Sequence, residues 1–183
     1  MGLIIIVGLL IVVIGFVIAL YNSIVQLKIR ADSAWSDIDV QLKRRHDLIP
    51  NLVETVKGYA AHEKGTFENV AKWRSAAMSA AAPAERAQAE GQLTMALKSL
   101  FAVAEAYPQL RANENFMSLQ NTLTQIESDV QNSRRYYNAV VRDYNTRIQT
   151  FPANMFAGMF GFQPRQFFEL ETPAERAVPS VKF

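Results

Sequence analysis

The first 27 residues contain no Asp, Glu, Lys, Arg or His, so every charged side chain of this 183-residue chain lies in the remaining 156 residues. Within this segment, residues 2–21 form an apolar run of 20 residues. A helix rises about 1.5 Å per residue, so a helix of this length crosses the roughly 30 Å hydrocarbon core of a bilayer. The segment therefore predicts a transmembrane anchor, with Tyr21 and Asn22 at the depth of the membrane interface.

A cleaved secretory signal is the other interpretation of an apolar N-terminal segment. Such a signal has a basic N-terminal region, a shorter apolar core and a cleavage site with small residues. Here Met1 and Gly2 carry no side-chain charge, and no Ala-x-Ala sequence follows the apolar run. We therefore interpret residues 1–22 as a permanent anchor.

The basic residues nearest the anchor all follow it. Lys28 and Arg30 come first, then Lys43, Arg44 and Arg45, whereas no Lys or Arg precedes the apolar run. Basic residues favour the cytoplasmic side of a membrane. The pattern predicts a single-pass protein with its N-terminus outside and its body in the cytoplasm.

The body shows the periodicity of long helices. Apolar residues recur at three- and four-residue steps over about 22–59, from Phe67 to the stretch before Pro83, over about 84–107, and from Phe116 to Ile148. No segment shows the two-residue alternation of a half-buried strand. The sequence predicts an all-α fold, in which an N-terminal transmembrane helix continues into an elongated antiparallel bundle of about four helices. Pro50 removes one backbone donor, and we expect a kink at residues 46–50.

The last of these helices has the clearest apolar seam. Its apolar positions alternate by three and four residues over more than four heptads, interrupted at Ser133. A helix of about 38 residues is roughly 57 Å long and needs an equally long partner. Residues 22–59 are the expected antiparallel partner. The predicted division is an anchor at 1–22, a bundle at 23–151, and an apolar patch with an extended tail at 152–183.

Residues 151–162 are apolar and uncharged, but this segment is too short to cross a bilayer. One interpretation is that the segment folds back over the end of the bundle. The other is that it contacts a second subunit or the bilayer surface, because methionine and phenylalanine suit a contact surface. The candidate interaction residues are Met155, Phe156, Met159, Phe160 and Phe162.

Two polar clusters interrupt the apolar pattern of the body. Arg44, Arg45 and His46 precede the expected kink, and Arg134 and Arg135 interrupt the seam of the last helix. The first cluster lies about 15 residues beyond Lys28, roughly 22 Å from the interface on an upright helix, which disfavours lipid contact. We interpret both clusters as structural.

No pattern of catalytic or cofactor-binding residues is found. The chain has no cysteine and two histidines, and His62-Glu63 is followed by Thr66, where a zinc-protease sequence has its second histidine. Phosphate-binding glycine loops and nucleophile elbows are absent from the sequence. We expect no cofactor, no metal and no catalysis, and a net charge of +2 does not indicate nucleic-acid binding.

Several stretches together resemble the LemA family of bacterial membrane proteins. These are RRHDLIPNLVETVKGY at 44–59 with His62-Glu63, EAYPQL at 105–110, RRYYN at 134–138, Tyr144-Asn145, Phe151-Pro152, and Pro179-x-Val-x-Phe183. Trp73 departs from the pattern, because a small residue is expected before Arg74. The resemblance implies a single-pass protein of the bacterial inner membrane with a cytoplasmic helical bundle, and it implies no catalytic activity or cofactor.

These features favour a non-enzymatic, membrane-anchored scaffold or interaction protein that associates with itself, with the bilayer and possible membrane proteins as partners. One alternative is an accessory subunit or regulator of a membrane enzyme, such as an envelope-maintenance protease. If such a site exists, Arg44, Arg45, His46, Arg134 and Glu105 would converge in one concave pocket. A sensor with a releasable tail is a further alternative, for which the sequence offers no ligand-binding motif.

Overall fold

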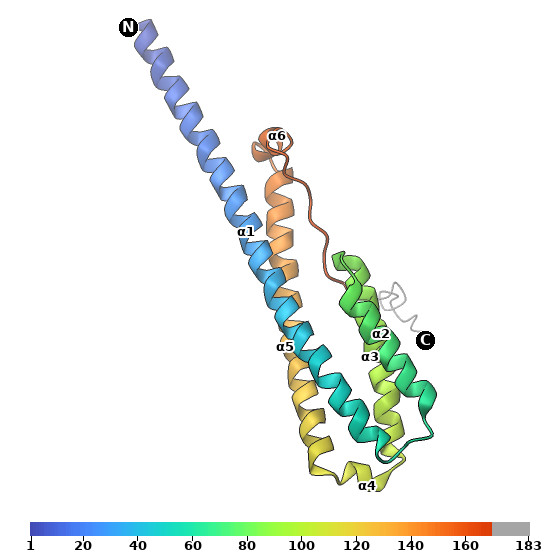
Figure 1. The fold of residues 1–183 in the computed structure, drawn as a ribbon. Helices are drawn as coiled ribbons and strands as arrows, with labels where there is room; N and C mark the ends of the chain where they lie inside the picture. The colour runs from blue at the N-terminus through green and yellow to red at the C-terminus, as the bar shows by residue number, and fades with distance from the viewer. Residues whose placement is uncertain (170–183) are drawn as a thin grey trace, which may run out of the picture. The chain divides into compact units, whose positions relative to one another are not determined.

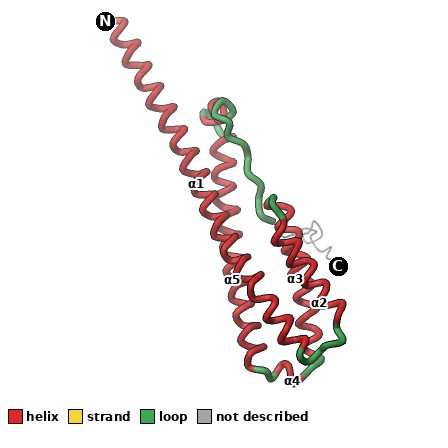
Figure 2. The backbone as a smooth tube through the Cα atoms, in the orientation of Figure 1, coloured by secondary structure: helices red, strands yellow, loops and turns green. Residues whose placement is uncertain are grey.

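The computed structural model describes residues 1–169, which form helices and loops without a strand (Figures 1 and 2). The helices are α1 (Gly2–Lys57), α2 (Lys64–Ser79), α3 (Pro83–Glu105), α4 (Pro108–Arg111), α5 (Glu114–Gln149) and α6 (Ala153–Ala157). This confirms the predicted all-α fold and adds the two short helices α4 and α6. Residues 163–169 are non-helical, and the rest of the predicted tail, with Val181 and Phe183, lies outside the described residues.

The chain divides into two compact units. Among the described residues, the first consists of residues 1–38 and 133–166, and the second of residues 39–132 and 167–169. Both α1 and α5 contribute residues to each unit, and α1 continues through Asn22 and Pro50 as one helix.

The apolar run of α1 is left uncovered by protein. Most of its large apolar side chains between Leu3 and Ile18 are 47–75% exposed. Among the described residues, α1 is the one helix long and apolar enough to cross a membrane. A core helix of a soluble protein would instead be largely buried. The exposed run therefore indicates a membrane protein.

The core of the first unit begins in the last turn of the apolar run. Leu20 and Ile24 of α1 pack with Tyr144 and Ile148 of α5, and Ala153 and Ala157 of α6 complete this cluster. Early residues of α1 thus contact late residues of α5, which is the antiparallel pairing expected from the apolar seam. No linker separates the apolar run from the first packed layer.

The second unit is built around the α2–α3 pair and the C-terminal part of α1. Ile49, Leu52 and Val56 of α1 share one core with α2, α3 and α4, and with Phe116 and Leu123 of α5. Proline defines two helix starts: Pro83 opens α3 and Pro108 opens α4, because a proline at the first helical position loses no backbone hydrogen bond.

Trp73, the residue that departs from the family pattern, is half-buried on α2. Its indole packs against the core of the second unit. The Nζ atom of Lys72 lies 4.9 Å from the centroid of its ring. The helix accommodates the large side chain at its edge, so the core itself does not have to widen.

Candidate functional site

Three polar side chains are buried in the core of the second unit. Arg45, His46 and Glu90 are 1%, 6% and 1% exposed. Arg45 and His46 lie on the face of α1 that also carries Leu42 and Ile49, three or four residues away in each direction, so the helix turns them inward. A buried charge is costly unless it is paired, so the partners of these groups determine what the site can do.

Glu90 of α3 is bound by both residues of α1. Its Oε2 atom accepts a hydrogen bond from Nη1 of Arg45 at 2.5 Å, and its Oε1 atom lies 2.7 Å from Nε2 of His46. The carboxylate accepts from the guanidinium of Arg45, and the tautomer of His46 that carries its proton on Nε2 can donate to the second oxygen. Each carboxylate oxygen of Glu90 therefore has a donor.

Arg45 extends the network to two further side chains. Its Nη2 atom lies 2.8 Å from the hydroxyl of Thr94, one turn beyond Glu90 on α3, and 2.6 Å from a carboxylate oxygen of Glu127 on α5. The guanidinium group thus joins α1, α3 and α5. We call Arg45, His46, Glu90, Thr94 and Glu127 the buried polar network.

Arg74 of α2 compensates for the proline in α1. In a helix, the carbonyl of His46 would accept a hydrogen bond from the backbone N–H of residue 50, which proline lacks. The Nε atom of Arg74 donates to this carbonyl at 2.8 Å. This contact satisfies a half-buried acceptor and ties α2 to α1, which explains how the helix tolerates Pro50 in its interior.

The buried polar network has the chemistry of a structural clamp. Its carboxylates and donors face one another, and its three central residues are shielded from water. Within residues 1–169, no group of three or more His, Cys, Asp or Glu side chains is placed to hold a metal ion. Among the described residues, removing Glu90 would leave the buried guanidinium of Arg45 with Glu127 as its one acidic partner, and removing Arg45 would leave the carboxylate of Glu90 with His46 alone.

The five polar residues singled out in the sequence have different surroundings. Arg45 and His46 belong to the buried polar network, whereas the side chain of Arg44 is 55% exposed and lies 3.9 Å from Asp129. Arg134 is half-buried and Arg135 exposed, both on the part of α5 that belongs to the first unit.

Glu105, the remaining residue of the possible enzymatic site, lies apart from the network in the second unit. It lines a separate pocket of about 360 Å³ with Arg111, Phe116 and Gln120. Sequence reasoning missed Arg74, Glu90 and Glu127. The signal for Glu90 was its position in an apolar stripe of α3, beside Leu93 and Ala87.

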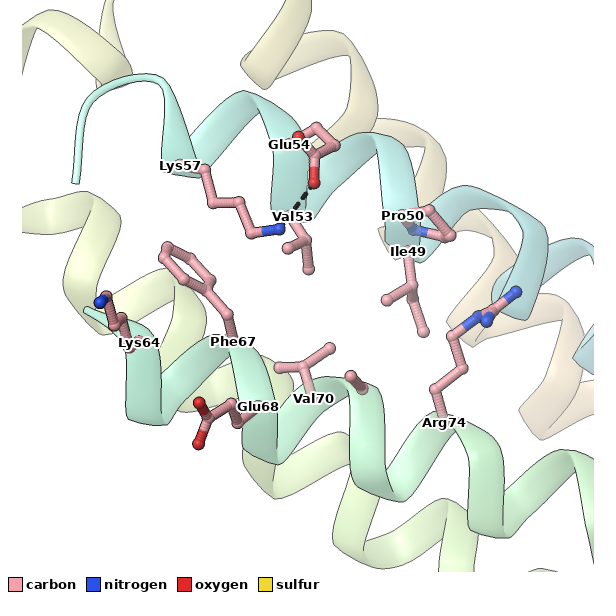
Figure 3. Close-up of a pocket in the computed structure, with 11 residues that line it drawn as sticks. Ile49, Pro50, Val53, Glu54, Lys57, Lys64, Phe67, Glu68, Val70 and Arg74 are labelled. Atoms are coloured by element: carbon pink, nitrogen blue, oxygen red, sulfur yellow. Dashed lines mark hydrogen bonds and ion pairs between the residues drawn. The ribbon is translucent and has the colours of Figure 1, made fainter. Parts of the chain in front are cut away.

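A groove of about 450 Å³ lies between α1 and α2 (Figure 3). Its apolar lining comes from Ile49, Pro50 and Val53 of α1, and from Phe67 and Val70 of α2. Charged side chains surround this lining: Glu54, Lys57, Lys64, Glu68 and Arg74. Lys57 donates to Glu54 at 2.7 Å, and Arg74 stands at the end of the groove near Pro50 (Figure 3).

In the first unit, the uncharged segment 151–162 folds around α6. We call this segment the elbow. It meets α1 through aromatic rings: the ring centroid of Tyr21 lies 5.1 Å from that of Phe160 and 5.7 Å from that of Phe162. Phe156 and Phe162 also pack against the core of the first unit.

The elbow is therefore covered on one side and open on the other. Four apolar side chains remain exposed: Met155 (61%), Met159 (81%), Phe160 (45%) and Phe151 (78%). The five candidate interaction residues thus divide into two that line the core and three that remain accessible.

Residues 163–166, which follow the elbow, run along α5 and are held through their backbone. We call them the strap. The hydroxyls of Tyr144 and Tyr137 donate to the carbonyls of Gln163 and Gln166 at 3.1 and 2.9 Å. Asn145 donates to the carbonyl of Arg165 and accepts from its N–H, both at 2.9 Å.

Burial raises the pKa of both strap-binding tyrosines above the usual value of 10.0, because their phenolates would lose hydration. The guanidinium of Arg165 opposes this shift of the pKa, and the carboxylate of Asp32 adds to it. Arg165 itself is paired with Asp32 of α1 at 2.5 Å. The two phenols therefore remain neutral hydrogen-bond donors over a wide pH range.

Comparison with known proteins identifies the family. The sequence profile of the LemA family matches residues 34–183. The chain belongs to the LemA family. The match begins after the apolar run, so the evidence for a membrane-spanning helix comes from the length and composition of α1.

The curated relatives of this LemA-family chain include magnetosome proteins. Magnetosome protein MamQ 2 from Paramagnetospirillum magneticum is 26% identical over 84% of this chain and 66% of its own length. Magnetosome protein MamQ from Magnetospirillum gryphiswaldense is 25% identical with the same coverage. Protein LemA from Metamycoplasma hominis is 24% identical over 74% of this chain and 63% of its own length. The chain spans just under two thirds of the length of these relatives.

Proposed function

We propose that this LemA-family protein is a non-enzymatic, membrane-anchored scaffold that holds a helical body against the cytoplasmic face of a bacterial cell membrane and associates with further copies of itself. The observation that carries the proposal is that the apolar run and the first packed layer belong to one helix. Leu20, in the last turn of the run, is 5% exposed and already part of the core of the first unit.

A continuous helix between anchor and body fixes the body relative to the membrane, whereas a flexible linker would only keep it nearby. An enzyme that requires only localisation can be held by a flexible linker. In α1, a hinge of that kind is absent between the apolar run and Ile24, so the first unit is fixed at the point where the helix leaves the membrane. A fixed body presents the same surface at the same height in every copy, which suits a scaffold.

The chemistry of the second unit supports a non-enzymatic role. The most unusual polar groups of the chain, Arg45, His46 and Glu90, are bound to one another in the core. All three side chains are at most 6% exposed, so a substrate could not contact them without a rearrangement of the core. A structural clamp accounts for their arrangement.

The cytoplasmic orientation is tested with reporters fused to the C-terminus of the full chain. Because Lys28 and Arg30 follow the apolar run, we expect a fluorescent protein that matures only in the cytoplasm to be active. We also expect a phosphatase that folds only outside the membrane to be inactive. The reverse pair of results would overturn the proposed orientation.

Self-association is tested by measuring the mass of the full chain in mild detergent over a wide concentration range. We expect a mass of more than one copy. A monomer mass at every concentration would overturn this part of the proposal. Phe156 packs against the core, so Phe156→Asp would damage the fold as well as a surface. Variants of exposed Met155 and Met159 instead show whether the contact between copies lies at this segment or elsewhere on the chain.

The groove in Figure 3 supports a second candidate, an accessory subunit or regulator of a membrane protease. An apolar lining with a charged rim is typical of a groove for a partner helix. Val53 also packs against the core, so the fold of Val53→Lys is first checked by circular dichroism. If the variant is folded, we expect it to reproduce the effect of removing the protein on proteolysis in isolated membranes. Unchanged proteolysis in membranes that lack the protein would contradict this candidate.

A further inference from the structure

We propose that the elbow, residues 151–162, is a second membrane contact, whose exposed methionine and phenylalanine side chains enter the headgroup layer of the same bilayer that α1 crosses. This inference rests on the proposed function, because it requires the apolar run of α1 to span a membrane. It assigns a ligand, the lipid surface, to a part of the chain far in sequence from the anchor.

The depth of the elbow follows from its contact with Tyr21. If residues 2–21 cross the hydrocarbon core, Tyr21 lies at the membrane interface, where tyrosine is enriched. The headgroup region adds roughly 5–8 Å on each side of the hydrocarbon core. The rings of Phe160 and Phe162 lie 5.1 and 5.7 Å from the ring of Tyr21, which places this end of the elbow beside a residue of that layer.

The composition of the elbow suits that depth. Its 12 residues carry no charge, and the four exposed apolar side chains are Phe151, Met155, Met159 and Phe160. Met155 lies on the short helix α6 and the other three flank it in sequence, whereas the buried residues Ala153 and Ala157 of α6 face the core of the first unit. The accessible side is therefore the apolar one, as in helices that lie in the interface plane.

Charged side chains appear where the chain leaves this layer. Arg142 and Arg147 of α5 line a shallow groove with Ser23 and Leu27 of α1, on the part of the first unit next to the elbow. Asp143 and two threonines, Thr146 and Thr150, complete that lining. Arginines beside an apolar contact match anionic headgroups. Along the first unit, the apolar run is thus followed by the apolar elbow, and the elbow by the two arginines, Arg142 and Arg147.

A second copy of the chain is the competing occupant of the elbow. The bilayer is favoured because the elbow is continuous with the apolar run through Tyr21 and Leu20, so the membrane is already present at this height in every copy. Contact with lipid requires no neighbour, whereas a subunit interface depends on concentration.

The chain has no cysteine, so single substitutions place one spin label at a time in the full chain. We would label Met159→Cys in the elbow, and Met95→Cys on α3 as a matched control that is 52% exposed in the protein. Val12→Cys reports whether the anchor is inserted. Each protein is reconstituted in vesicles of phosphatidylglycerol and phosphatidylethanolamine, and its collision rates with oxygen and a water-soluble nickel chelate are measured.

If Met159 lies 5–10 Å into the interface, its collision rate with the nickel chelate should be at least about threefold lower than that of Met95. Equal rates for Met159 and Met95, with Val12 shielded from the chelate, would overturn the inference and leave the proposed anchor intact. Val12 as accessible as Met95 would instead overturn the proposed anchor, on which the inference depends.

A subunit contact would give a different pattern. Spin labels on different copies would lie close together and show dipolar broadening at Met159, in detergent and in vesicles alike. The double variant Met155→Asp with Met159→Asp would then lower the mass measured in detergent. We expect the double variant to keep that mass, and its reduction to monomer would overturn the lipid assignment.

Discussion

The two units pack the same two long helices with different kinds of polar contact. In the first unit, the neutral hydroxyls of Tyr137 and Tyr144 bind backbone carbonyls of the strap. In the second unit, the charged groups of Arg45 and Glu90 bind each other in the core. Each hydrogen bond of the first kind can be lost without affecting the others. In the second kind, each buried charge depends on its partner, because the interior has a low dielectric constant.

This difference has a consequence for stability. Removing a neutral hydrogen bond costs about 0.5–1.5 kcal/mol, whereas removing one partner of a buried ion pair costs about 3–5 kcal/mol. The second unit should therefore be damaged more by a single substitution than the first. Four substitutions test this comparison, and we take them in order of expected effect.

The largest effect is expected for Glu90→Ala. This change leaves Arg45 and His46 without their shared acceptor in a core where all three are at most 6% exposed. We expect the free energy of unfolding of the full chain to fall by about 3–5 kcal/mol. The measurement is urea unfolding in mild detergent, followed by circular dichroism.

Glu68→Ala is the matched control for Glu90→Ala. Glu68 is exposed on the rim of the groove, so its removal should change the free energy of unfolding by no more than about 0.5 kcal/mol. If both variants lost the same free energy of unfolding, the buried polar network would contribute no more to stability than an exposed charge does.

The second-largest loss of stability is expected for Arg74→Met, because Arg74 supplies the donor that replaces the missing N–H of Pro50. Arg74→Met leaves the carbonyl of His46 without the hydrogen bond observed at 2.8 Å, and we expect a loss of about 1–3 kcal/mol in the free energy of unfolding. Pro50→Ala restores a backbone donor at the right position in the helix. In that background, Arg74→Met should cost at least about 1 kcal/mol less, because the two changes are coupled.

The same urea unfolding experiment measures this double-mutant cycle. Identical costs of Arg74→Met in both backgrounds would show that Arg74 stabilises the unit in another way, for example by packing along the groove of Figure 3. The cycle thus shows whether Arg74 stabilises the unit through its hydrogen bond to the His46 carbonyl or through packing of its side chain.

The helices themselves were predictable from the sequence because their signals are local. The three-four spacing from Phe116 to Ile148 predicted a helix of about 38 residues, and α5 has 36. Pro83 and Pro108 predicted the two breaks on either side of α3. The short helix α6 was not predicted, because its five residues are too few to show a period.

The polar partners were less predictable because they are distant in sequence. Arg45 and His46 were recognised as a polar cluster, but Glu90 lies 45 and 44 residues away, and nothing in the sequence pairs them. The kink expected at residues 46–50 stays a prediction. What the sequence did not reveal is that Arg74, 28 residues from His46, supplies a donor at that point.

A smaller effect is expected in the first unit for Tyr144→Phe, which removes one hydrogen bond from the strap. The expected loss in the free energy of unfolding is about 0.5–1.5 kcal/mol. Burial raises the pKa of Tyr144 in the folded chain above 10.0. The corresponding contribution to stability is therefore fully present below pH 10 and is lost as the pH rises through the raised pKa.

Tyrosinate absorbance during an alkaline titration checks this assignment. The wild-type chain should show part of its absorbance change above the usual titration range, and Tyr144→Phe should lose some of that late amplitude. Exposed Tyr136→Phe is the control, and it should leave the late amplitude unchanged. A late amplitude that is the same in all three proteins would contradict the assignment.

The smallest effect is expected for Asp32→Asn, which removes the ion pair with Arg165 of the strap. The two side chains are 57% and 23% exposed, so solvent screens the pair, and the expected loss is at most about 1 kcal/mol. The strap keeps its bonds to Asn145, Tyr137 and Tyr144, so the fold should persist. Because salt also screens surface charges, the loss should shrink further between 0.05 and 1 M salt, about 14 and 3 Å in screening length.

Urea unfolding at the two salt concentrations checks this expectation, with Asp37→Asn on the exposed side of α1 as the control. The proposed difference between the two units would be wrong if Asp32→Asn lowered the free energy of unfolding as much as Glu90→Ala does, and if this loss did not change with salt. Such a result would mean that the strap depends on one charge as strongly as the core of the second unit depends on Glu90. The neutral contacts of Tyr137, Tyr144 and Asn145 would then be secondary to that pair.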